Sequence, residues 1–185
     1  MNKLFTKKAF SNLLFIIVLG LLLYPPTREW GMRQLAFTPS VEKTENAETI
    51  NNYNWNLKGL NTENVNFNEF EDKVIFVNFW ATWCPPCRAE MPMIQKLYND
   101  YKDKVAFVFI TNENWNTVKP FFDKNRYDLP VYNSISSPPQ KFTETNSIPA
   151  SYLIDKNGAI LISKVGAADW NSTKVRNLLN DLISK

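Results

Sequence analysis

The sequence predicts an α/β fold in which a central mixed sheet is flanked by helices. Two apolar runs, residues 74–80 (VIFVNFW) and Val105–Ile110 (VAFVFI), are rich in β-branched and aromatic residues. Such runs are typical of central strands that are covered on both faces. Between them, apolar residues recur at three- and four-residue steps over Pro85–Tyr101, which predicts a helix with one buried face. A strand, a helix and a strand of these lengths form a βαβ unit with a right-handed crossover.

The other expected elements are shorter. Their ranges are 55–57 with 65–67 for a hairpin of edge strands, 116–125 and 140–145 for two helices, 150–155 with 160–165 for a second hairpin, and 172–184 for a closing helix. The edge hairpin would form a short N-terminal strand extension of the sheet. Asn157 and Gly158 lie between the strands of the second hairpin, where Asn-Gly is a favoured turn.

The first 54 residues predict three segments ahead of a domain at 55–185. Residues 1–8 are basic, with Lys3, Lys7 and Lys8, and residues 9–24 are strongly apolar. That pattern indicates a membrane anchor or a signal segment. No small-residue cleavage site follows the run, so we expect an uncleaved single-pass anchor and keep a cleaved signal as the alternative. The preceding lysines would keep residues 1–8 cytoplasmic and export the domain to the periplasmic side. Residues 25–54 are expected to be a linker.

Composition excludes several classes of function. The chain of 185 residues has no histidine, which removes Ser–His and Cys–His catalysis and His-based metal sites. A net charge of +3, partly located in the first eight residues, leaves no basic surface for nucleic acid. Only two cysteines are present, too few for a structural zinc site or a disulfide framework. Thiol redox chemistry is the class of function that remains.

The two cysteines, Cys84 and Cys87, stand in a CxxC motif between a strand and a helix. Cys84 would take the N-cap place and Pro85 the first helical position, where proline is favoured. The positive end of the helix dipole stabilises a thiolate there, which predicts Cys84 as the nucleophile and Cys87 as the resolving thiol. Pro85 and Pro86 lack an N–H, so few donors face the Cys84 sulfur. We therefore expect a moderately acidified thiol and a reducing poise.

The segment FVNFWATWCPPCRAEMP resembles the active-site segment of membrane-anchored, thioredoxin-like thiol–disulfide oxidoreductases of bacteria, the group of the cytochrome c maturation reductases. The resemblance extends from about residue 55 to the C-terminus and implies a thioredoxin-like fold. It also implies that Cys84 is the exposed nucleophile, that Cys87 is its buried partner, and that Trp83 packs beside them.

Two polar residues near the cysteines have different expected roles. Glu90 follows Cys87 by three residues on the same helical face, and its structural interpretation is an acid favoured in the first helical turn. The resemblance implies instead that Glu90 manages the proton of Cys87. Asn78 stands where ordinary thioredoxins have a buried aspartate. Because an amide cannot exchange a proton, Glu90 is expected to replace that aspartate.

The residues expected to bind the substrate surround the cysteines. Pro149 would be an ordinary trans proline at a strand start by base rate, since only about 5–6% of X-Pro bonds are cis. The resemblance implies a cis proline packed against the CxxC, with Ile148 facing the substrate chain. Trp83, Pro85 and Pro86 complete this expected surface.

These features predict an extracytoplasmic enzyme, a thiol–disulfide oxidoreductase that reduces disulfides of partner proteins. The resemblance implies apocytochrome c as one such partner, and a membrane electron donor is needed to reduce the enzyme again. No cofactor or metal is expected, and an open face for exchange partners favours a monomer. The alternatives are a general or stress-linked thiol–disulfide oxidoreductase of the same fold and a thiol-based metal chaperone.

Overall fold

A computed structural model gives the fold, and it describes residues 2–34, 37–41 and 47–184. The described chain forms one seven-stranded mixed sheet in the order β2-β1-β5-β4-β3-β6-β7. The strands are β1 (Asn56–Gly59), β2 (Val65–Asn66), β3 (Val74–Phe79), β4 (Val105–Ile110), β5 (Val131–Ser134), β6 (Ala150–Ile154) and β7 (Ile160–Val165). The α-helices are α1 (Asn2–Leu23), α2 (Pro25–Gln34), α3 (Pro85–Tyr101), α4 (Trp115–Asn125) and α5 (Thr173–Ser184), and the 3₁₀ helices include η2 (Phe67–Phe70) and η3 (Gln140–Thr143).

The centre of the sheet is the expected βαβ unit. Strand β3 pairs in parallel with β4, with Asn78 opposite Phe109, and pairs antiparallel with β6, with Asn78 opposite Ser151. Strands β4 and β5 are also parallel, whereas the other pairs are antiparallel. The sheet is therefore mixed, as the sequence predicts. Strand β3 lies inside it, between β4 and β6, so the loop that follows β3 begins between two other strands.

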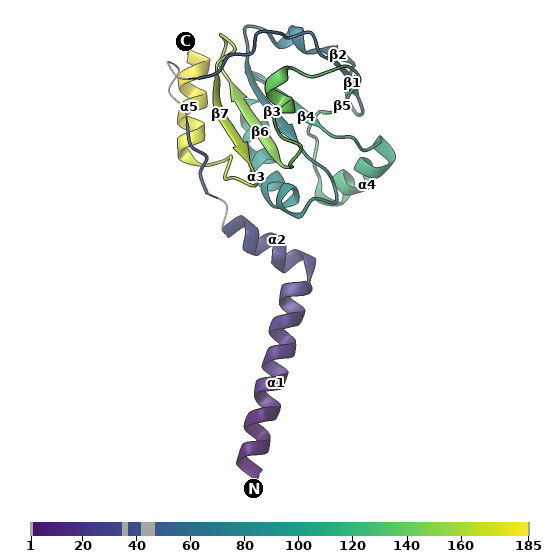
Figure 1. Ribbon diagram of the computed structural model, residues 1–185, viewed down its shortest axis with the longest axis vertical. Helices are drawn as coiled ribbons and strands as arrows, with labels where there is room; N and C mark the ends of the chain where they lie inside the picture. The colour runs from purple at the N-terminus through teal and green to yellow at the C-terminus, as the bar shows by residue number, and fades with distance from the viewer. Residues whose placement is uncertain (1, 35–36, 42–46, 185) are drawn as a thin grey trace.

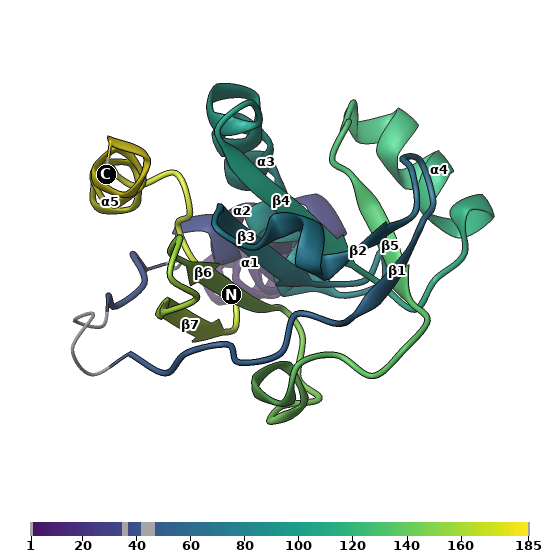
Figure 2. The ribbon, with the colours of Figure 1, turned by 90° about the horizontal axis from the view of Figure 1, so that it is seen from above.

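The two faces of the sheet bury different cores. Helices α3, α4 and α5 lie on one side of the sheet, and η3 lies on the other (Figure 2). Because side chains alternate along a strand, Val74 and Phe76 of β3 face the helices, while Ile75 and Val77 face the second core. Asn78 continues the first series, so its side chain lies on the face that α3 covers.

Helix α3 matches its predicted bounds and begins as expected. Cys84 is its N-cap with an extended backbone (φ −84°, ψ 107°), and Pro85 and Pro86 occupy the first helical positions. Pro92 lies inside the helix. The residues that α3 buries follow the apolar spacing of the sequence, with Cys87, Glu90, Met91, Ile94 and Leu97 directed at the sheet. Thus one helical face carries both the core contacts and two residues of the expected active site.

Two features differ from the sequence expectation. Strand β5 was not anticipated, because only Val131 and Tyr132 are apolar in this short segment after Pro130. The expected linker of residues 25–54 contains helix α2, whose start is favoured by prolines at its first positions. Helix α2 packs against α3, and Glu29 forms an ion pair with Arg88 at 2.5 Å. Residues 35–36 and 42–46 of that interval lie outside the described part of the chain.

The described linker residues after α2 also pair with the domain. Phe37 forms a parallel bridge with Ala168, and Thr49 forms an antiparallel bridge with Ala159. The backbone of residues 48–50 is bonded to both sides of the turn between β6 and β7, since Ile50 donates to the Gly158 carbonyl and Ile160 donates to the Glu48 carbonyl. The segment before residue 55 therefore forms part of the domain surface.

Helix α1 extends away from the rest of the molecule (Figure 1). Its apolar side chains are exposed, among them Phe10, Leu13, Phe15 and Ile16. Within the described ranges, no helix combines the length and the hydropathy needed to cross a membrane.

Candidate active site

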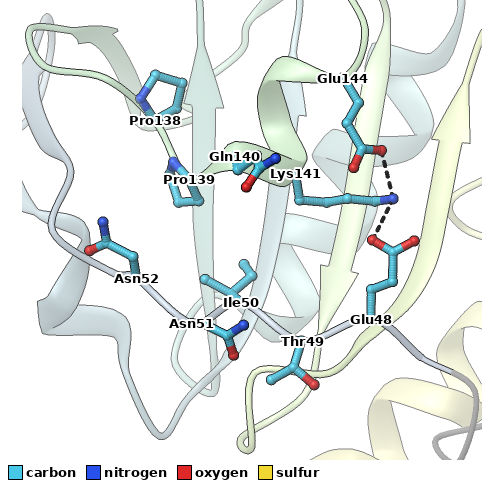
Figure 3. A pocket seen from close by; sticks show the side chains of 10 residues that line it. All are labelled: Glu48, Thr49, Ile50, Asn51, Asn52, Pro138, Pro139, Gln140, Lys141 and Glu144. Atoms are coloured by element: carbon cyan, nitrogen blue, oxygen red, sulfur yellow. Dashed lines mark ion pairs between the residues drawn. The ribbon is translucent and has the colours of Figure 1, made fainter.

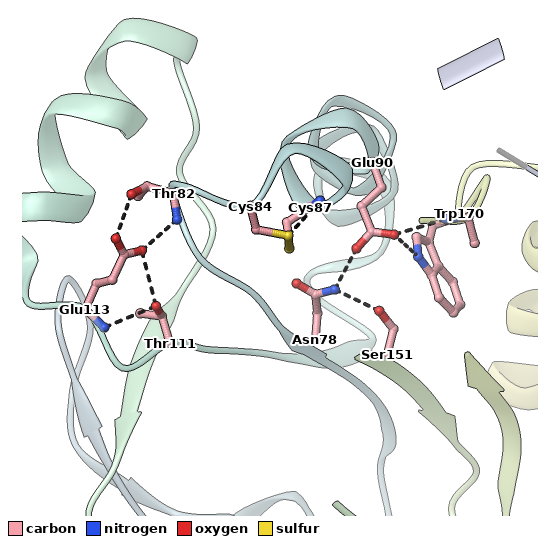
Figure 4. Close-up of a disulfide and its surroundings, with 10 residues drawn as sticks. Asn78, Thr82, Cys84, Cys87, Glu90, Thr111, Glu113, Ser151 and Trp170 are labelled. Atoms are coloured by element: carbon pink, nitrogen blue, oxygen red, sulfur yellow. Dashed lines mark hydrogen bonds between the residues drawn. A yellow bond between two sulfur atoms is a disulfide. The ribbon is translucent and has the colours of Figure 1, made fainter. Parts of the chain in front are cut away.

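The two cysteines form a disulfide at the point where β3 leads into α3 (Figure 4). Their Cα atoms are 5.3 Å apart, and the Cys84 sulfur accepts the backbone N–H of Cys87 at 3.2 Å. That amide is one of the free donors at the start of α3, where the helix dipole favours negative charge. The site therefore offers a sulfur at position 84 that a helix terminus can stabilise as a thiolate.

Both sulfurs are buried in this disulfide form, which corrects the expectation of an exposed Cys84. Only 2% of Cys84 and 1% of Cys87 are exposed, and both belong to the helix-covered core. The exposed residue of the motif is the preceding Trp83, at 69%. Pro85 and Pro86 are half-buried beside it.

Glu90 lies one helical turn after Cys87 and is completely buried. One of its carboxylate oxygens accepts from the Asn78 amide at 2.9 Å. The other accepts from the Ala168 backbone N–H at 3.1 Å and from the Trp170 indole N–H at 3.0 Å. Burial raises the pKa of Glu90 to about 7, and the three hydrogen bonds oppose that rise without cancelling it. Near neutral pH this carboxyl can therefore either give or take a proton.

Asn78 connects this carboxylate to the sheet. Its amide nitrogen donates to Glu90 Oε1 and, at 2.7 Å, to the hydroxyl of Ser151 on the neighbouring strand β6. Its amide oxygen Oδ1 is buried and has no hydrogen-bond partner among the described residues. Sequence reasoning placed Asn78 at this position but did not identify Ser151 or Trp170 as members of the network.

A second network holds the loop that precedes Cys84. Glu113, in the loop after β4, accepts from the Thr82 backbone N–H at 2.6 Å and from the Thr82 hydroxyl at 2.7 Å. Asn133 of β5 donates to the backbone carbonyls of Thr111 and Glu113. The loop before the nucleophile is thus attached to the ends of β4 and β5. Sequence reasoning missed Glu113, because its partner is 31 residues away and no local motif links the two.

The peptide bond between Ile148 and Pro149 is cis, as the resemblance implies. Pro149 is buried, and its carbonyl accepts from Gly166 at 2.8 Å. Ile148 is half-buried and lines, with Trp83 and Glu113, a small pocket of about 110 Å³. Among the described residues its backbone N–H and carbonyl have no hydrogen-bond partner. The structure thus brings Trp83 and Ile148 together at the surface beside the cysteines.

A polar pocket of about 430 Å³ lies elsewhere, between residues 48–52 and the start of η3 (Figure 3). Lys141 forms ion pairs there with Glu48 and Glu144, each at 2.7 Å. None of its lining residues belongs to the cysteine site. The pocket is therefore separate from the redox chemistry.

The fold and the CxxC pair at the start of α3 together define a thioredoxin-like protein with a redox-capable dithiol. The chain belongs to the Redoxin family, which matches residues 37–182.

Curated relatives and a solved structure agree with this. The chain is 33% identical over 110 residues to "Thiol-disulfide oxidoreductase ResA" of Halalkalibacterium halodurans, which covers 58% of this chain and 62% of that protein. It is 29% identical over 164 residues to "Thioredoxin-like protein YneN" of Bacillus subtilis, which covers 86% of this chain and 91% of that protein. A thiol-disulfide isomerase from Corynebacterium glutamicum superposes with a TM-score of 0.60 at 20% identity, over 76% of this chain and 99% of that chain, and supports the fold alone.

Proposed function

We propose that this chain is a thiol–disulfide oxidoreductase that reduces disulfides of partner proteins through Cys84 and Cys87. The observation that carries the proposal is the bonded cysteine pair at the start of a helix, preceded by an exposed Trp83 that shares a pocket with Ile148, the residue before the cis proline. The name of the ResA relative states the same activity for that protein, of which this chain spans 62%. The fully buried carboxyl one turn from Cys87 adds the proton donor and acceptor that a dithiol reaction needs.

The reaction has two exchange steps. The Cys84 thiolate attacks one sulfur of the partner's disulfide, which forms a mixed disulfide and releases the partner's other sulfur as a thiolate. Cys87 then gives up its proton and attacks Cys84, which forms the enzyme disulfide and releases the partner's second sulfur. Each released thiolate takes up one proton. The partner gains two electrons and two protons in total; the enzyme loses two electrons, one proton when Cys84 ionises and one proton from Cys87.

Glu90 is proposed to take the proton of Cys87 in the second step. The two residues are three apart on one face of α3, and a carboxyl with a pKa of about 7 is half ionised near neutral pH. A base poised near the operating pH is the most effective general base. The carboxylic acid formed can then return its proton when the enzyme is reduced again.

The partner is proposed to approach over Trp83 and Ile148. The unpaired backbone groups of Ile148 are available to an extended partner segment, which would pair with them as an added strand. Pro85 and Pro86 lie beside this approach at the start of α3. Haem-attachment cysteines of apocytochrome c are the proposed partner class, and a general or stress-linked oxidoreductase of the same fold is the alternative.

The proposed direction is reduction. Of the residues after Cys84, both Pro85 and Pro86 lack a backbone N–H, and the Cys84 sulfur accepts one backbone donor, the N–H of Cys87. Fewer donors mean a less stabilised thiolate and a more reducing pair. A redox titration against glutathione tests this. A midpoint near that of thioredoxin, about −270 mV, agrees with a reductant, and one near −120 mV would identify an oxidant.

The proposed location is the cell membrane, with residues 9–24 as a single-pass anchor and the domain on the extracytoplasmic side. The apolar side chains of α1 are exposed, and Lys7 and Lys8 precede the apolar run. Because the chain has only two cysteines, a membrane-impermeant maleimide applied to reduced intact cells should label this protein without permeabilisation. Labelling that requires permeabilised cells would contradict the location while leaving the exchange chemistry intact.

A further inference from the structure

The amide oxygen of Asn78, Oδ1, has no role in the exchange chemistry described above. Asn78 is 1% exposed, and its Oδ1 is a buried acceptor without a partner among the described residues. Buried polar atoms are nearly always hydrogen-bonded, since leaving one unpaired costs its full desolvation penalty. An unpaired acceptor at this position suggests a donor that exists in another state of the protein.

The amide orientation is determined by its neighbours. Both hydrogens of the Asn78 nitrogen are used, one by Glu90 Oε1 at 2.9 Å and one by Ser151 Oγ at 2.7 Å. The opposite orientation would place the amide oxygen against the ionised Glu90 carboxylate, where two acceptors would face each other. The free oxygen therefore points away from Glu90.

The free oxygen lies on the side of the cysteines. In Figure 4 the oxygen of the Asn78 amide is on the disulfide side and its nitrogen is on the Glu90 side. Asn78 belongs to the sheet face that α3 covers, and Cys87 is directed from α3 toward that face together with Glu90 and Met91. In the disulfide, neither sulfur carries a hydrogen that it could donate.

Reduction creates the missing donor. The disulfide takes up two electrons and two protons, the S–S bond breaks, and Cys87 becomes a buried thiol with an S–H group. We propose that Asn78 Oδ1 accepts the hydrogen bond of the Cys87 thiol in the reduced protein, so that Asn78 stabilises the dithiol. Asn78 carries no proton itself. Its role differs from that of a buried aspartate, because an amide cannot titrate.

This inference rests on the proposed exchange through Cys84 and Cys87, but its tests need no partner protein. Removal of the acceptor should destabilise the reduced form, which loses a hydrogen bond. It should stabilise the oxidised form, which no longer buries an unpaired acceptor. In the full chain in detergent, Asn78→Ala should therefore shift the thiol–disulfide equilibrium with glutathione about tenfold toward the disulfide, which corresponds to a midpoint about 30 mV more negative. Ser151→Ala is the matched control, since it alters the same amide's other contact and keeps Oδ1, and its equilibrium should stay within about twofold of wild type.

The same shift should persist in a Glu90→Gln background. If the effect of Asn78→Ala disappears there, Asn78 acts only through Glu90 and the proposal is wrong. An equally large shift in Ser151→Ala would also overturn it, because a general loosening of the network would then explain the result.

Infrared spectroscopy tests the hydrogen bond directly. In a Cys84→Ser protein, Cys87 is the only thiol of the chain, so its S–H stretching band can be read without overlap. The band should lie at the lower frequency of a hydrogen-bonded thiol, rise when Asn78→Ala is added, and stay low with Asn78→Asp, which keeps an oxygen at that place. A band at the frequency of a free thiol in the Cys84→Ser protein would overturn the inference, even if the alanine variant fails to fold. Failure of exchange with partners, with these bands as expected, would instead count against the proposed function.

Discussion

At the scale of residues, Glu90 is a completely buried acid whose pKa is raised by its burial. Its folded pKa of about 7 lies above the ordinary value of 4.5, because the carboxyl is completely buried. The folded state therefore binds this proton more tightly than the unfolded state. The contribution of Glu90 to the free energy of unfolding is greatest below about pH 4.5, declines as the pH rises toward 7, and is constant above it.

The Glu90→Gln variant should lack this pH dependence. We expect the wild-type oxidised protein to lose on the order of 3 kcal/mol of stability between pH 4.5 and 7 through this group, whereas Glu90→Gln loses none of that part. Urea denaturation at several pH values measures the difference. Parallel curves for the two proteins over this range would mean that Glu90 is not a buried acid with a raised pKa.

The same variant should slow the second exchange step by about 10²-fold.

Trp170 should tune the same carboxyl. Its indole N–H lowers the pKa of Glu90, so Trp170→Phe, which keeps an aromatic ring against Phe76, should raise that pKa by about one unit. Infrared titration of the carboxyl measures it. Trp55→Phe is the control, because Trp55 is equally buried but donates to Ser134 and not to Glu90. A shift of equal size in both variants would show a general effect of tryptophan loss.

At the scale of elements, the loop between β3 and α3 is held by a residue far away in the sequence. Glu113→Ala removes the acceptor of both the N–H and the hydroxyl of Thr82, two residues before Cys84. We expect a loss of roughly 1–3 kcal/mol in stability. We also expect slower attack by Cys84, because its position is less well held. Thermal unfolding and the rate of reaction with a small disulfide measure the two effects.

Glu144→Ala is the control for the Glu113→Ala prediction. Glu144 pairs at the surface with Lys141, which keeps its second partner Glu48, so little stability should be lost. Equal losses in the two variants would show that the Glu113 carboxylate does not restrain the loop. A loss of stability without any change in the rate would mean that Thr82 and Cys84 are positioned independently.

The elements also show which parts of the fold the sequence can predict. Strands β3 and β4 and helix α3 follow directly from long apolar patterns, and the N-cap position of Cys84 follows from the order strand, CxxC and proline. Strand β5 could not be found this way, because it owes its existence to pairing with β4 and β1 and not to its own composition. Helix α2 was missed for a similar reason, since its residues are polar and its packing against α3 is a tertiary contact.

The residues of the candidate site can likewise be separated into those that the sequence identifies and those that it does not. Cys84, Cys87 and Glu90 can be recognised from their spacing and from the family resemblance, because they lie within two turns of one helix. Ser151, Trp170 and Glu113 could not, because the sheet and the loops bring them to the site from positions 31 to 80 residues away from their partners. The motif also does not reveal that Cys84 is buried in the disulfide form.

At the scale of the whole molecule, the domain and helix α1 are separate parts joined through α2. The Glu29–Arg88 ion pair attaches α2 to the helix that begins with the cysteines. If α1 is the anchor, α2 determines how the cysteine face is presented to partners at the membrane. The chemistry itself needs only the domain, since both sulfurs, Glu90 and the cis proline lie within residues 84–149.

The central claim is that Cys84 attacks and Cys87 resolves, and single-cysteine variants test it most directly. Reduced Cys87→Ser should react with a small aromatic disulfide at a rate close to wild type and remain as a stable mixed disulfide on Cys84. Reduced Cys84→Ser should react at least about a hundredfold more slowly, because Cys87 lacks the helix N-cap position that stabilises a thiolate. Equal rates for the two variants, or faster reaction at Cys87, would contradict the assignment of roles and the mechanism built on it.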